Sequence, residues 1–461
     1  MPYYQQAIDN QAASTDYALY QKGILQGLLG DVDGKTATMN TLLTQYPKSK
    51  FKADGLFEKG KAQLSLGNSN EAKKLFSDLL AEFPNSIYAK KAQLNIGLIY
   101  FNNNEDDEAL NVFKKVVGNY PGSPEAAEAL ATIKSIYVSN GTPDKYFEYA
   151  KTVSNVSISE GAQDSITYEA AEQQYLNQKF DDAKISFVKY LDQFTNGIFK
   201  INATFYLAEC NYRANKFDEA LSGYESIVEQ PKNLFSEKSL LKAGNINYKN
   251  KTYDKAISHY AKLEQTADLR DNIIYAQTGL MRSYFKNKQY DQALLYSQKL
   301  ISAEKVSNEI VAEAHLTNGR CALLTDDYVT AKKEFQMMAK QSSAVGAESR
   351  YNLALIEYKQ NNFKTSQAKC FEIINEVPSY DYWIGKSFIL LADNYAALKD
   401  TFQAKQTLQS IIDNFEVDPS DPEDIKALAT ARFNELDSSG TKDLLKPEEP
   451  KEQETDINNA K

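Results

Sequence analysis

The sequence predicts an all-α protein, built as a solenoid of about eleven repeated helix–turn–helix units. Three observations predict this fold. First, an aromatic residue, a proline and a serine recur in QYPKS, EFPNS and NYPGS, which end 37 residues apart at Ser49, Ser86 and Ser123. Second, small, aromatic and aliphatic residues recur between these segments at the spacing of one helix face. Third, glycine (20) and proline (12) are scarce among 461 residues, as expected for a folded helical chain.

Each unit is expected to begin with a helix that we call helix A. In the third unit, Ile96 and Tyr100 belong to an apolar face that predicts a helix over about 88–101. The following asparagines, Asn102 to Asn104, predict the turn that ends it. A small residue on helix A is expected to let a neighbouring helix approach closely. These small residues are Gly23, Gly60, Gly97, Ala171, Ala208, Gly244, Gly319, Ala354 and Ala392.

The second helix of each unit, helix B, is expected over about 106–118 in the third unit. It carries a small residue near its start, and in most units an aromatic residue follows four positions later, at Phe76, Phe113, Phe187, Tyr224, Tyr260 and Phe335. The small residues are Ala72, Ala109, Ala183, Ala220, Ala256, Ala293, Ala331, Ser366 and Ala404. Proline ends helix B because it cannot continue the helical hydrogen-bond ladder. Ser49, Ser86 and Ser123 should then cap the next helix A, each contributing about 1 kcal/mol.

The repeats organise most of the chain. Residues 126–153 form a degenerate unit, in which Lys134 and Tyr146 replace the small residues. A polar stretch after it predicts a soft boundary, interpreted as a bend in one solenoid, with independent domains as the alternative. Residues 1–13 are interpreted as the remnant of a preceding repeat, so we expect the chain to be part of a longer solenoid. The predicted segments are 1–13 (remnant helix), 14–153 (repeats 1–4), 154–165 (boundary), 166–415 (repeats 5–11), 416–437 (capping helix) and 438–461 (disordered tail).

Composition argues against several functional classes. The formal net charge of -10 and the pI near 5.1 argue against broad electrostatic binding of nucleic acid. The sequence contains no apolar run of about 18 residues, so no transmembrane helix is predicted. Two histidines offer almost nothing for a Ser-His-Asp triad or a metal site, and no cofactor motif is present. We therefore expect a non-enzymatic protein without a cofactor. The cysteines Cys210, Cys321 and Cys370 and the single tryptophan, Trp383, are expected to be packing residues.

Over residues 14–415, these repeats resemble the tetratricopeptide repeat family. The resemblance implies a right-handed superhelix whose A helices line the concave face, where the ligands of this family lie. The aromatic-Pro-x-Ser repeats are also similar to bacterial envelope proteins, such as the outer-membrane assembly lipoprotein and the Tol–Pal coordinator. That similarity implies a location in the bacterial cell envelope, in the periplasm, with peripheral envelope association. The alternative is a cytoplasmic location.

The resemblance implies a scaffold that binds a protein or peptide partner in its concave groove. Two alternatives remain open: an assembly factor of an envelope complex that acts through the surfaces or ends of the solenoid, or the targeting arm of a larger enzyme. The carboxylate-binding set of this family is incomplete here, since Asn245 with Lys242 is its nearest approach.

Six cations near the ends of A helices predict a basic streak that could bind an acidic partner segment. The alternative is that cations in the last turn only stabilise the helix dipole, by about 0.3–1 kcal/mol each. The basic streak consists of Arg213, Lys249, Lys286, Lys359, Arg282 and Arg320, and the aromatic residues Tyr212 and Tyr248 accompany it as candidate partner-binding residues.

Overall fold

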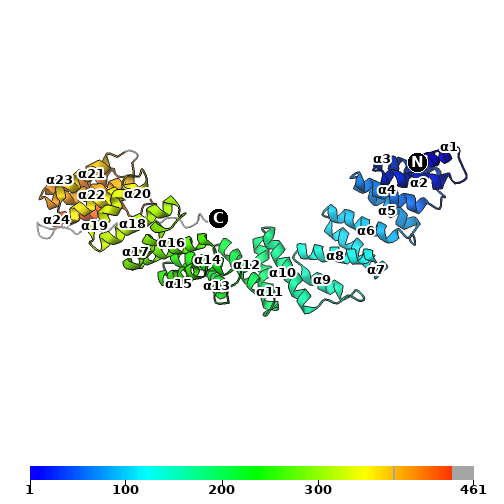
Figure 1. Ribbon diagram of the computed structural model, residues 1–461, viewed down its shortest axis with the longest axis horizontal. Coiled ribbons are helices and arrows are strands. Elements are labelled where there is room, and N and C mark those ends of the chain that lie inside the picture. The colour runs from blue at the N-terminus through cyan, green and yellow to red at the C-terminus, as the bar shows by residue number, and fades with distance from the viewer. Residues whose placement is uncertain (377–378, 439–461) are drawn as a thin grey trace. The chain divides into compact units, whose positions relative to one another are not determined.

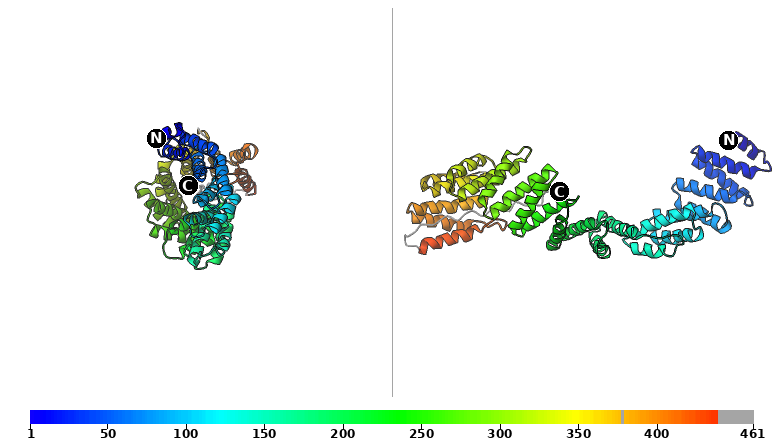
Figure 2. Two further views of the ribbon diagram at one scale, coloured as in Figure 1. Left: turned by 90° about the vertical axis from the view of Figure 1, so that its right-hand side faces the viewer. Right: turned by 60° about the horizontal axis from the view of Figure 1, so that its bottom comes forward.

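The computed structural model describes residues 1–376 and 379–438, and these residues form 24 α-helices and no strand (Figure 1). The predicted all-α repeat fold is confirmed. The chain divides into two compact units, which meet in sequence between Lys216 and Phe217. Within each unit, consecutive helices pack side by side (Figure 2).

The first unit begins with a short helix, α1, and then alternates A and B helices. Its even-numbered helices from α2 to α12 are A helices, and its odd-numbered helices from α3 to α11 are B helices. The bounds are α1 (Pro2–Asp9), α2 (Thr15–Leu28), α3 (Val32–Gln45), α4 (Lys52–Ser65), α5 (Ser69–Glu82), α6 (Ala89–Asn102), α7 (Asp106–Asn119), α8 (Pro124–Ser139), α9 (Pro143–Ala150), α10 (Glu160–Leu176), α11 (Phe180–Gln193) and α12 (Lys200–Arg213).

The second unit continues the alternation, with odd-numbered B helices and even-numbered A helices. Its bounds are α13 (Phe217–Val228), α14 (Ser236–Lys249), α15 (Tyr253–Thr266), α16 (Arg270–Lys286), α17 (Tyr290–Ser302), α18 (Asn308–Leu324), α19 (Tyr328–Met338), α20 (Ala344–Lys359), α21 (Phe363–Ile374), α22 (Asp381–Ala397), α23 (Thr401–Asn414) and α24 (Ile425–Ser438). The described residues therefore contain eleven consecutive A/B pairs from α2 to α23, as predicted. The final helix follows them at α24.

The boundaries follow the repeat pattern closely. The predicted helices over 88–101 and 106–118 are α6 and α7, each within one residue. The segment 154–165 lies inside the first unit, where α10 contacts both α8 and α9. The predicted division into domains stays a prediction. The predicted tail lies outside the described residues from 439 onward.

Close packing explains the small residues of the pattern. A Cβ on Gly97 would lie 2.5 Å from the ring of Phe113, and a Cβ on Gly319 would lie 2.6 Å from the ring of Phe335. Each ring belongs to helix B of the same unit and fills the space left by the glycine. Interiors packed at this density do not tolerate an added methyl group without displacement. The predicted packing residues Cys210, Cys321, Cys370 and Trp383 are all buried.

The serines after the prolines behave differently from one another. Ser123 caps α8, because its Oγ accepts a hydrogen bond from the amide of Ala126 at 3.1 Å. The prediction that Ser49 and Ser86 also cap helices is wrong, because α4 and α6 begin three residues after these serines. Ser86 instead accepts a hydrogen bond from the amide of Tyr88 at 3.2 Å, inside the turn.

The proline segments are tight turns. The serine amide donates to the carbonyl of the aromatic residue three positions earlier, at 2.9 Å for Ser49–Tyr46 and 3.0 Å for Ser86–Phe83. Proline thus occupies the second position of a four-residue turn, where its fixed φ is favourable. The turn between helices A and B is closed by a left-handed residue, such as Asn104 with φ 60°, as the asparagines predicted.

The A helices form the inner layer of the second unit. Each helix A contacts the next one, from α14 through α16, α18 and α20 to α22. Successive B helices of this unit have no contact of that extent within the described residues. Successive A helices are therefore closer together than successive B helices. The layer of A helices lies on the inside of the resulting curve, and its face is the more enclosed one.

Candidate functional site

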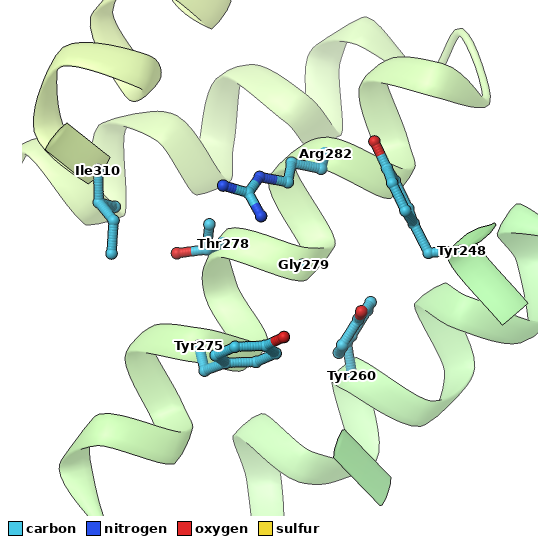
Figure 3. A pocket seen from close by; sticks show the side chains of 7 residues that line it. All are labelled: Tyr248, Tyr260, Tyr275, Thr278, Gly279, Arg282 and Ile310. Carbon is cyan, nitrogen blue, oxygen red and sulfur yellow. The ribbon is translucent and has the colours of Figure 1, made fainter. Parts of the chain in front are cut away.

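A cavity of about 110 Å³ lies in the second unit and is built mainly by three consecutive A helices. Helices α14, α16 and α18 contribute side chains, and one ring comes from the B helix α15. The lining residues are Tyr248, Tyr260, Tyr275, Thr278, Gly279, Arg282 and Ile310 (Figure 3).

Gly279 lines the cavity with its backbone, because it has no side chain. The matching position lies fourteen residues before the small residue of helix B and carries a side chain in the other A helices of this unit. These matching residues are Lys242, Thr317, Asn352 and Leu390. Gly279 also lets Tyr260 insert between two A helices, since a Cβ on either Gly244 or Gly279 would lie 2.6 Å from its ring. One ring is therefore held between two glycines.

An amide group fixes two of the tyrosines. The hydroxyl of Tyr260 donates to Oδ1 of Asn245 at 2.6 Å, and Nδ2 of Asn245 donates to the hydroxyl of Tyr275 at 2.8 Å. Asn245 is buried, so this network holds both rings in fixed orientations. Asn245, the nearest approach to a carboxylate-binding set in the sequence, is thus engaged within the protein.

Arg282 lies at the cavity and is paired with the next helix A. Its Nε and Nη2 donate to the two carboxylate oxygens of Glu313 on α18, both at 2.6 Å. Burial alone would lower the pKa of Arg282, but the hydrogen bonds and negative charge of Glu313 outweigh burial and raise it. Figure 3 shows the guanidinium between Ile310 and Tyr248.

A second arginine of the basic streak makes the same contact one repeat later. Arg320 on α18 donates from Nε and Nη2 to Glu348 on α20, at 2.6 and 2.7 Å. Arg282 and Arg320 therefore tie consecutive A helices together, and a glutamate compensates the charge of each.

The structure separates the members of the basic streak. Arg213 and Tyr212 lie in the first unit, whereas the other candidates lie in the second unit. The guanidinium of Arg213 lies over the ring of Phe180, 4.6 Å from its centroid. Lys249 is exposed, and Lys286 and Lys359 are half-buried. Among the candidates, Tyr248 and Arg282 meet at the cavity, and partner binding by the whole set stays a prediction.

Sequence reasoning missed several residues of this site. Tyr275, Ile310 and Glu313 do not belong to the repeating pattern of small and aromatic residues. They come together only because helices that are separate in the sequence pack against one another in the fold. Gly279 was visible as a glycine inside a predicted helix A, two residues before the expected small position at Met281. A glycine inside a helix, at a position where the repeat pattern does not place a small residue, was the feature of the sequence that pointed to this cavity.

The titratable groups are engaged in structural contacts. His259 lies 3.2 Å from Glu225, and His315 lies 2.7 Å from Glu334. Burial raises the pKa of the Cys210 thiol to about 11, which keeps it protonated near neutral pH. In residues 1–376 and 379–438, no three His, Cys, Asp or Glu side chains gather as metal ligands. What the cavity offers chemically is apolar contact and hydrogen-bond donors.

Several solved structures are similar to this chain at low identity. A tetratricopeptide repeat protein from Parabacteroides merdae is 15% identical, with a TM-score of 0.30, over 57% of this chain and 98% of that one. Yeast Tom70 is 12% identical, with a TM-score of 0.31, over 92% and 96%. The Cut9–Hcn1 hetero-tetramer of APC/C matches at 12% identity, with a TM-score of 0.32, over 93% of each chain. No curated protein matches the chain.

Two family models match parts of the sequence. The outer membrane lipoprotein family matches residues 52–134, which include two of the proline turns. The tetratricopeptide repeat family matches residues 17–49, 202–233 and 382–416, near the start, middle and end of the repeats. In the part of the chain that the structure describes, no helix has the length and apolar character needed to cross a membrane. With these three matches and its eleven helix pairs, the chain contains tetratricopeptide repeats.

Proposed function

We propose that this protein is a non-enzymatic scaffold that binds a partner polypeptide on the A-helix face of its second unit. The observation that carries the proposal is the cavity shared by α14, α16 and α18 on that face. Sites for small molecules and cofactors usually enclose about 300–1,000 Å³. A cavity of about 110 Å³ is too small for such a ligand and matches a single side chain. A polypeptide lying along the A helices could place one side chain there.

The positive charges of the basic streak are expected to contribute less to partner binding than the sequence pattern suggested. Glu313 and Glu348 already compensate Arg282 and Arg320, so these arginines mainly hold the A helices together. The other members of the basic streak in the second unit are Lys249, Lys286 and Lys359, whose side chains are exposed or half-buried. They can attract an acidic stretch of the partner, and salt should weaken that attraction because exposed charges are screened beyond about 8 Å.

The match of residues 52–134 to an outer membrane lipoprotein family supports a second role for the first unit. In this proposal the protein is located in a bacterial cell envelope, in the periplasm, and the first unit contributes an assembly surface. A cytoplasmic location is the alternative. Fractionation of cells of the source organism should recover the full-length protein with periplasmic or envelope material, and recovery with the cytoplasm would contradict the envelope role.

Site-specific photo-cross-linking tests the partner face. A photoreactive residue replaces Lys249 beside the cavity, Val329 on the exposed side of the B helix α19, or Ile87 in a turn of the first unit. We expect one discrete cross-linked partner from position 249 and none from position 329. Cross-links from position 87 alone would favour assembly through the first unit. Cross-links from position 329 without any from position 249 would overturn binding on the A-helix face.

A further inference from the structure

We propose that the cavity at Gly279 takes one branched aliphatic side chain of the partner, while Arg282 donates hydrogen bonds to the main-chain carbonyl beside it. This inference rests on the proposed function, because it assumes that the side chain in the cavity belongs to a partner polypeptide. The preference of the cavity itself can be measured without the partner.

The size of the cavity selects the side chain. An engineered apolar cavity of about 150 Å³ holds a benzene molecule. At about 110 Å³, the cavity here is smaller than that benchmark. A phenyl or indole ring would have to displace Tyr260 or Tyr275, which Asn245 holds in place. Leucine, isoleucine and valine side chains are smaller and fit without displacing these rings.

The walls select an uncharged side chain. The rings of Tyr260 and Tyr275 bound the cavity while their hydroxyls bond to Asn245. Thr278 is buried, and its hydroxyl donates to the carbonyl of Ile274 at 2.8 Å. A charged side chain would lose its hydration there and would meet an arginine that a glutamate already compensates.

Arg282 selects the backbone of the partner. A guanidinium carries five N–H donors, and the contacts with Glu313 use Nε and one proton of Nη2. The other donors are suited to a neutral acceptor, because the pair with Glu313 has no net charge. A main-chain carbonyl next to the anchored side chain is such an acceptor, and every extended peptide provides one.

The test uses the full-length protein with isoleucine methyl groups labelled for NMR, because Ile310 lines the cavity. The probes are the N-acetyl N-methylamides of leucine, phenylalanine and aspartate. We expect the leucine probe to shift the Ile310 methyl signal and to bind at least about tenfold more tightly than the other two, since only it buries an apolar side chain without strain. No shift with the leucine probe, or equal shifts with all three, would overturn the inference.

Two substitutions at one position provide the matched control. Thr278→Met should fill the cavity and weaken the leucine probe about tenfold or more, whereas Thr278→Val keeps the shape and should bind within about twofold of the wild type. Equal binding by both variants would contradict the assignment. The methyl signals of buried isoleucines elsewhere in the second unit, such as Ile389 and Ile411, report whether each variant is folded. If the probe fails while position 249 still cross-links a partner, the cavity assignment is wrong and the scaffold function stands.

Discussion

The two units tie successive A helices together with different cations. In the first unit, Lys134 on α8 contacts Glu169 on α10 at 3.2 Å, and their side chains are 35% and 50% exposed. In the second unit, Arg320 makes two bonds to Glu348, and these side chains are 16% and 8% exposed. A lysine is a flexible point charge, whereas the guanidinium of arginine matches both oxygens of a carboxylate. These two joints therefore differ: the lysine pair is exposed and flexible, whereas the arginine pair is nearly buried and fixed by two hydrogen bonds.

This difference bears on where a partner would bind. A binding cavity keeps its shape only if the helices around it hold their spacing. The cavity lies on three A helices, two of which, α16 and α18, are joined by Arg282 and Glu313. The first unit also fixes its repeats through turns, where Asp54 accepts a hydrogen bond from Tyr88 at 3.0 Å. Such a contact fixes the end of a helix. The middle of the helix is then positioned only by the packing of its side chains.

The largest expected effect comes from removing one partner of an arginine pair. Arg320→Met leaves the nearly buried Glu348 without its counter-charge, so we expect the free energy of unfolding to fall by about 2–3 kcal/mol. Lys134→Met breaks an exposed pair and should cost about 0–1 kcal/mol. Chemical denaturation of the two variants measures both values. Equal losses would show that the units are joined with equal strength.

A smaller effect separates two helical glycines. In Gly279→Ala, the new Cβ would meet the ring of Tyr260, and we expect a loss of about 1–3 kcal/mol. Gly118→Ala in α7 meets nothing within 4 Å and should gain about 0.5–1 kcal/mol from helix propensity. Thermal unfolding of the two variants should therefore shift in opposite directions. A stabilised Gly279→Ala protein would mean that Tyr260 does not occupy the space between the glycines.

The smallest effect compares two serines of the first unit. Ser123→Ala removes a helix cap and should cost about 1 kcal/mol. Ser86→Ala removes only a contact within a turn, so its cost should be smaller. The measurement is the denaturation midpoint of each variant beside the wild type. If Ser86→Ala proves the more costly change, the turn serine has a larger role than its hydrogen bond indicates.

The fold could be predicted from the sequence because close packing leaves a periodic record. A ring such as Phe113 needs a residue as small as Gly97 opposite it, and this requirement recurs in unit after unit. The serine caps were predicted only in part, since the pattern does not show how many residues separate a turn from the helix that follows. Ser123 lies directly before α8, whereas Ser86 lies three residues before α6.

The candidate site was less predictable for physical reasons. Arg282 was identified as a cation near the end of a helix, but its partner Glu313 lies 31 residues later and Glu348 lies 28 residues after Arg320. These separations do not follow the repeat, because they depend on how each long side chain is directed between helices. Gly279 lines the cavity, and the ring of Tyr260 occupies the space beside it. The repeat pattern does not show which neighbouring side chain occupies such a space.

Hydrogen exchange tests most directly whether a partner binds on the A-helix face of the second unit. Amide exchange is measured on the full-length protein alone and in complex with the partner identified by cross-linking. Slower exchange in α14, α16 and α18, with B helices such as α19 unchanged, is the predicted result. Protection confined to the B helices or to the first unit would contradict the proposed function.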